Sequence, residues 1–135
     1  MNSHGKFCCL YLLIVILIAG FLAYIIKGII FLIEDYEVSN DCKRSNLWEY
    51  VLVSMISTTI NFGIKNNNFT LFAILVIIIG IVNISMCIWG GIELWNYSCD
   101  DLIKTNLWRV GLASFILQLT VSLICILTIP FILFY

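Results

Sequence analysis

Residues 69–92 read FTLFAILVIIIGIVNISMCIWGGI, a stretch of 24 residues without a charged side chain. A bilayer core about 30 Å thick needs about 20 mostly apolar residues in a helix that rises about 1.5 Å per residue. Buried strands of soluble proteins end at a turn signal after about 4–8 residues, and glycine is the only such signal here. Unpaired backbone is costly in hydrocarbon, and a run of this length satisfies its backbone as a helix. Residues 69–92 therefore predict a membrane-spanning helix.

Three further apolar runs surround this stretch: Phe7–Ile33, Leu47–Ile64 and Leu107–Tyr135. The gaps between the four runs are 13, 4 and 14 residues, too short for a folded domain, which generally needs at least about 40 residues. The second run is the weakest because it is short and carries several polar residues, but the four-residue gap after it fits a helical hairpin. The first run could instead be a signal peptide, although it exceeds the usual apolar length of about 7–15 residues. We predict an all-α membrane protein, with one domain (residues 1–135) of four transmembrane helices.

The composition argues against several classes of protein. Hydrophobic residues make up 62% of the chain and charged residues 11%, and the mean hydropathy is +1.08, whereas a soluble domain carries about 25% charged residues. Seven Lys and Arg against eight Asp and Glu leave no basic surface for nucleic acid. The single histidine, His4, is in the N-terminal tail, and the sequence shows no nucleophile–base pair, metal-binding cluster or phosphate loop. We therefore expect a non-enzymatic protein without cofactor or metal, whose partners are the lipid bilayer, further copies of itself or other membrane proteins.

The chain resembles itself at an offset of 60 residues. Asp41–Ser54 (DCKRSNLWEYVLVS) aligns with Asp101–Ser114 (DLIKTNLWRVGLAS), with six identities in fourteen positions. Chance explains matching leucines in apolar segments, but poorly explains Asn-Leu-Trp at the same helix entry. We predict two repeated helical hairpins, residues 7–64 and 69–135, related by an axis along the membrane normal. Ser45–Asn46 and Thr105–Asn106 are the expected N-caps of the second and fourth helices.

The two sides of the predicted bundle differ in charge and in cysteines. All eight acidic residues and all four tryptophans lie on the side of the two longer loops. Cys42 and Cys99 are in these loops and are candidates for a disulfide in an oxidising compartment. Cys8 and Cys9, at the start of the first helix, suit reversible palmitoylation in the cytosol, although such cysteines are often unmodified. The distribution of Lys and Arg weakly favours the opposite orientation; we predict that both termini are cytoplasmic.

Polar residues also lie within the predicted spans. Glu49 and Arg109 occupy equivalent positions of the two repeats, with opposite charges, so they are candidates for an ion pair that aligns the hairpins. The alternative is that each side chain reaches the headgroups separately. Small and weakly polar residues form one stripe on each of the last two helices, which favours close helix packing over a polar path. These stripes are Gly80, Asn83, Cys87 and Gly91, and Gly111, Ser114, Gln118 and Ser122.

The two hairpins share further features with a known family. The first contains Gly28, an acidic stretch, Cys42 and the helix from Leu47. The second contains Gly90-Gly91, Asn96-Tyr97-Ser98-Cys99 and the helix with Leu107-Trp108. Together they resemble the small four-span proteins of the transmembrane protein 272-like family, which implies an architecture but no activity.

We therefore expect a structural or scaffolding component that acts by lateral association in a membrane. The alternatives are a subunit of an oligomeric channel or transporter and a viral envelope component.

Overall fold

The computed structural model describes residues 3–63 and 68–134, and every regular element within them is a helix. The first half contains α1 (Ser3–Glu34), the short α2 (Tyr36–Asp41) and α3 (Leu47–Gly63). The second half contains α4 (Phe69–Gly91), the π-helical turn η1 (Ile92–Asn96), the short α5 (Asp100–Ile103) and α6 (Asn106–Phe134). The prediction of an all-helical chain is confirmed.

Three helical segments are long and apolar enough to cross a membrane: Phe7–Glu34, Phe69–Asn96 and Asn106–Phe134. The remaining long helix, α3, has 17 residues. At a rise of about 1.5 Å per residue it is about 26 Å long, slightly less than a typical hydrocarbon core. Its predicted last residue, Ile64, lies outside the described residues, as do residues 65–67 of the predicted hairpin turn and the predicted last residue of the fourth span, Tyr135. The crossing by α3, and with it the total of four spans, therefore stays a prediction.

Short polar side chains begin the helices that follow the loops. The Ser45 hydroxyl accepts the Leu47 N–H at 3.2 Å, and the Thr105 hydroxyl accepts the Trp108 N–H at 3.3 Å. The Asn68 side chain accepts the Thr70 N–H at 3.1 Å at the start of α4. Such bonds satisfy N–H groups that have no partner within the first helical turn. Capping by Ser45 and Thr105, as predicted, is confirmed.

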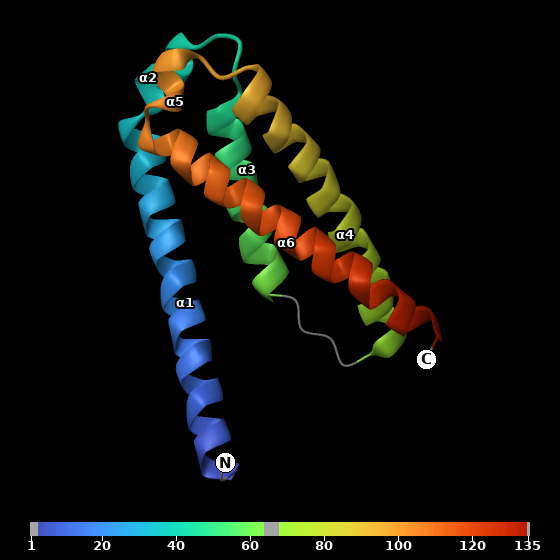
Figure 1. Ribbon diagram of the computed structural model, residues 1–135. Coiled ribbons are helices and arrows are strands. Elements are labelled where there is room, and N and C mark those ends of the chain that lie inside the picture. The colour runs from blue at the N-terminus through green and yellow to red at the C-terminus, as the bar shows by residue number, and fades with distance from the viewer. Residues whose placement is uncertain (1–2, 64–67, 135) are drawn as a thin grey trace.

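α1 and α6 lie close together at one end of the molecule and diverge toward the other, where α6 approaches the start of α4 (Figure 1). α6 packs against α4 and α3, and α1 contacts α3 and α6. α2, η1, α5 and the loops that join them gather at one end, which we call the loop-bearing end (Figure 1). Both chain termini lie at the opposite end, where α1 stands apart from α4 and α6.

The buried apolar residues concentrate near the loop-bearing end. Leu47, Val51, Leu94, Leu102 and Leu107 are at most 1% exposed. At Gly90 a β-carbon would collide with the ring of Tyr50, so this glycine allows α4 to approach α3 closely. The core therefore fixes the positions of the loops and of the helix ends around them.

Candidate functional site

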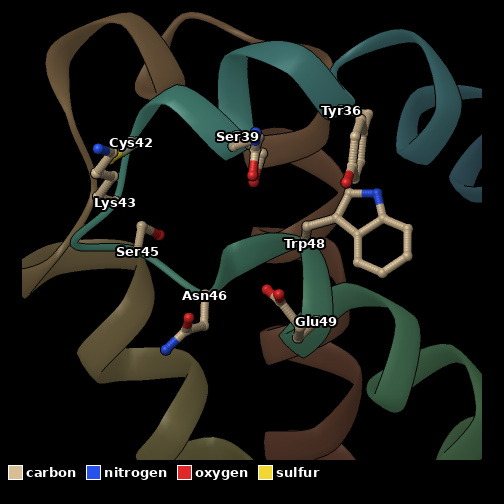
Figure 2. Close-up of a pocket in the computed structure, with 9 residues that line it drawn as sticks. Tyr36, Ser39, Cys42, Lys43, Ser45, Asn46, Trp48 and Glu49 are labelled. Atoms are coloured by element: carbon tan, nitrogen blue, oxygen red, sulfur yellow. The ribbon is translucent and has the colours of Figure 1, made fainter.

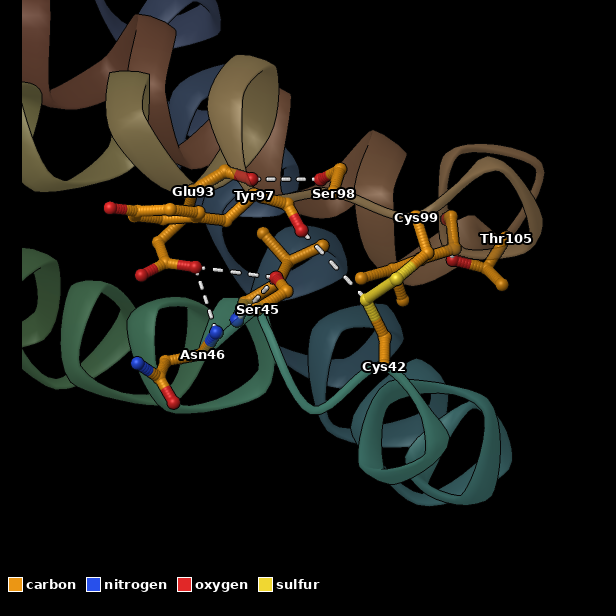
Figure 3. Close-up of a disulfide and its surroundings, with 10 residues drawn as sticks. Cys42, Ser45, Asn46, Glu93, Tyr97, Ser98, Cys99 and Thr105 are labelled. Carbon is orange, nitrogen blue, oxygen red and sulfur yellow. Dashed lines mark hydrogen bonds between the residues drawn. A yellow bond between two sulfur atoms is a disulfide. The ribbon is translucent and has the colours of Figure 1, made fainter.

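A disulfide joins the two halves of the chain at the loop-bearing end. Cys42 follows α2 and Cys99 precedes α5, and their Cα atoms are 6.1 Å apart (Figure 3). Their separation in sequence is 57 residues, so the bond connects the loop of one half to the loop of the other. The structure thus brings together the two cysteines that the sequence singled out.

A buried carboxylate of the second half caps a helix of the first half. Glu93, in η1, is 3% exposed. Its carboxylate accepts the Asn46 N–H at 2.7 Å, the Ser45 hydroxyl at 3.3 Å and the Trp89 indole N–H at 3.2 Å. Figure 3 shows the first two of these bonds. Several donors and the positive end of the α3 dipole together compensate for the burial of the charge.

The reciprocal contact comes from the first half. The Asp35 carboxylate, between α1 and α2, accepts the Leu107 N–H at the start of α6 at 2.9 Å. Each half therefore supplies a carboxylate, placed near the end of its first long helix, to the start of the other half's second long helix. These crossed caps hold α3 and α6 relative to α1 and α4.

Two tryptophans, 60 residues apart, make equivalent bonds within their own halves. The Trp48 indole donates to the Leu32 carbonyl at 2.8 Å, and the Trp108 indole donates to the Leu94 carbonyl at 3.2 Å. Each bond satisfies a carbonyl near the end of a long helix, where carbonyls lose their helical partners. We call the disulfide, the crossed caps and these two indole bonds the loop clamp.

The predicted small-residue stripes lie inside the bundle. Asn83, Ser114, Gln118 and Ser122 are buried, as are Gly80 and Gly111, and Cys87 and Gly91 are half-buried. A β-carbon at Gly80 would lie 3.3 Å from the Cβ of Cys125, so α4 and α6 are in close contact there. The stripes therefore lie between the helices, and the choice of helix packing over a polar path stays a prediction.

A polar network occupies the same interior. The Gln118 amide donates to the Ser54 carbonyl and the Thr58 hydroxyl, both at 3.3 Å, and the Tyr24 and Ser114 hydroxyls are 2.6 Å apart. Two buried atoms, the Tyr50 hydroxyl and the Gln118 Oε1, have no hydrogen-bond partner among the described residues. The interior thus has spare hydrogen-bonding capacity.

The structure does not bring Glu49 and Arg109 together. Both side chains are exposed, and no ion pair joins them within residues 3–63 and 68–134. This exposure agrees with the alternative, in which each reaches the headgroups separately. Cys8 and Cys9 are free and exposed on α1, as palmitoylation requires.

Sequence reasoning missed the capping roles of Asp35 and Glu93. Both belong to acidic stretches that normally indicate a solvated loop, and only the three-dimensional arrangement shows that each faces the other half. In the described part of the chain, no group of three or more His, Cys, Asp or Glu residues is placed to hold a metal ion.

Comparison of the chain with models of protein families, with curated proteins and with solved structures finds no match. The resemblance to the transmembrane protein 272-like family therefore stays a prediction.

Proposed function

We propose that the chain is a non-enzymatic, four-span integral membrane protein that acts as a scaffold through lateral association. Three membrane-compatible helices support the embedding. α3 runs from the loop-bearing end toward the end that holds both termini (Figure 1), and this course supports a fourth crossing. The paired contacts of the loop clamp support two repeated hairpins.

The observation that carries the scaffold role is the isolation of the N-terminal half of α1. Leu10, Ile14 and Leu17 are 56%, 44% and 61% exposed, and α1 stands apart from the other helices there (Figure 1). A helix held at one end, with a free apolar surface along the rest, can pack against a helix of another molecule in the membrane. Dispersion and close packing drive such association in lipid.

Photo-cross-linking tests this role. A photoreactive residue at Leu17 of the full-length protein in membranes should give protein adducts, because this part of α1 faces a neighbour. The same residue at Leu123 of α6, which is 52% exposed, is the matched control. Adducts with lipid alone at Leu17, or equal protein adducts at both positions, would contradict lateral association through α1.

The orientation has its own test. A disulfide persists in an oxidising compartment, which supports placing the loop clamp in a lumen or outside the cell and both termini in the cytosol. Tags at both ends should be degraded together by protease on the cytosolic side, and Cys42 and Cys99 should react with an impermeant maleimide only after reduction. Protection of one tag alone would contradict four spans.

The second candidate, a subunit of an oligomeric channel or transporter, is favoured by the polar interior. The unpartnered Tyr50 hydroxyl and Gln118 Oε1 are buried between helices, where a polar solute or water could bind. Ion flux into liposomes that contain the purified protein separates the two candidates. Selective conductance that Gln118→Leu abolishes would support transport and overturn the scaffold role.

A further inference from the structure

Three hollows of the surface meet on α3. The first is a polar pocket of about 370 Å³ at the start of this helix. Its lining includes Tyr36, Ser39, Lys43, Asn46, Trp48 and Glu49 (Figure 2). Tryptophan favours the headgroup level of a membrane because its ring is apolar and its N–H is polar. Trp48 therefore indicates that this pocket lies among the headgroups of the leaflet on the loop side.

The other two hollows are apolar grooves that run along the two sides of α3. One, of about 290 Å³, lies between α1 and α3 and includes Ile29 and Leu52. The other, of about 330 Å³, lies between α3 and α4 and includes Val53 and Ile78. Ile56 and Ile60 line both grooves. These two isoleucines therefore form a ridge with one groove on each side.

The helical register connects the pocket to both grooves. Glu49 lines the pocket, and it is followed by Leu52 three residues later and by Val53 four residues later. Residues three and four apart are neighbours on a helix surface. A molecule whose polar part occupies the pocket can thus extend one apolar arm into each groove.

The charges in the pocket indicate which kind of polar headgroup fits. Lys43 and Glu49 lie on different sides of it (Figure 2), and both are exposed. An ammonium side chain binds a phosphate, and a carboxylate binds an ammonium group. A zwitterionic headgroup carries both complementary charges, whereas an anionic headgroup such as phosphatidylglycerol carries the phosphate but no ammonium group for Glu49.

We propose that α3 carries a binding site for one zwitterionic diacyl phospholipid of the loop-side leaflet. The headgroup lies in the pocket between Lys43 and Glu49, and the two acyl chains lie on either side of the Ile56–Ile60 ridge. A helix of a second copy fits less well, because a helix about 10 Å wide would cover the ridge and leave both charges without partners. The site rests on the membrane embedding and is independent of the scaffold role.

Native mass spectrometry of the full-length protein tests the proposal. The protein is incubated with equal amounts of palmitoyl-oleoyl phosphatidylethanolamine and phosphatidylglycerol in mild detergent. The wild type should retain one phosphatidylethanolamine per chain in preference to phosphatidylglycerol. Loss of an exposed charge pair in Glu49→Gln should reduce retention roughly two- to fivefold, and Ile56→Trp should reduce it by obstructing both grooves.

The internal repeat supplies matched controls. Arg109 and Ile116 follow Glu49 and Ile56 by 60 residues and line none of the three hollows. Ile56 and Ile116 are each 54% exposed. Arg109→Gln and Ile116→Trp should therefore leave retention unchanged. Formation of the Cys42–Cys99 disulfide, read on a non-reducing gel, reports that each variant has folded.

Three results would overturn the site: equal retention in Glu49→Gln and Arg109→Gln, equal retention of both lipids by the wild type, or a second copy of the chain in place of the lipid. Extraction with carbonate distinguishes these results from a failure of the membrane embedding. A chain that stays in the membrane but retains no phosphatidylethanolamine lacks the site alone. A chain that carbonate releases would refute the embedding itself.

Discussion

The contacts that hold α1 to the rest of the molecule differ between the loop-bearing end and the opposite end. At the loop-bearing end a disulfide and two crossed carboxylate caps join the halves, and one indole bond within each half adds to them. At the other end residues 7–20 of α1 are exposed, and α1 stands apart from α4 and α6 (Figure 1). In lipid, apolar surface alone does not force helices together. The specific polar contacts of the loop clamp therefore hold α1 to the other helices at the loop-bearing end.

The strongest test of this difference removes the covalent link. Replacing both Cys42 and Cys99 by alanine releases a loop of about 57 residues, and the chain-entropy relation gives a loss of about 4 kcal/mol in the free energy of unfolding. Titration with sodium dodecyl sulfate in mixed micelles, followed by tryptophan fluorescence, measures this loss. The control replaces Cys8 and Cys9, which are exposed on α1. If both double variants lose the same stability, the disulfide does not close the bundle.

The next test compares the two carboxylates of the clamp. Glu93→Ala leaves the N–H groups of Asn46 and Trp89 and the Ser45 hydroxyl without their acceptor, and we expect a loss of about 3 kcal/mol. Asp35→Ala removes one cap from a half-buried position, with an expected loss of about 1 kcal/mol. The same titration measures both variants. A larger loss for Asp35→Ala would show that α6, and not α3, depends more on its crossed cap.

The third test compares two glycines, one from each end. At Gly90 a methyl group would collide with the Tyr50 ring, whereas at Gly20 nothing lies within 4 Å of the added carbon. Overpacking typically costs about 1–3 kcal/mol, so Gly90→Ala should lower the free energy of unfolding by about 2 kcal/mol. Gly20→Ala should cause no loss, since alanine is the better helix former. A comparable loss of unfolding free energy in both variants would mean that α1 is as closely packed at Gly20 as α4 is at Gly90.

Sequence patterns predicted the helices because a long apolar run in lipid has few backbone conformations other than the helix that satisfy its N–H and C=O groups. The cap residues Ser45 and Thr105 and the buried stripe that includes Ser114 and Gln118 were also predictable, since capping and helical spacing are local properties. The roles of Asp35 and Glu93 were not, because each bonds to a backbone N–H about 47 or 72 residues away. The prediction of an ion pair between Glu49 and Arg109 rested on the assumption that equivalent positions of the two repeats face each other. In the structure both side chains are exposed instead.

The smallest effect on stability is expected in the exposed N-terminal half of α1. A substitution there should affect association between chains without affecting folding. Leu17 is 61% exposed, so Leu17→Ala should change the free energy of unfolding of the isolated chain by less than about 0.5 kcal/mol. The same change should weaken association between chains in liposomes, measured by energy transfer between labelled copies, because it removes packing surface from α1. The comparison variant is Leu47→Ala, at a fully buried position, which should lose about 3 kcal/mol. If Leu17→Ala lost as much as Leu47→Ala, α1 would have to pack along its whole length against its own bundle. The free apolar surface on which the scaffold role depends would then not exist.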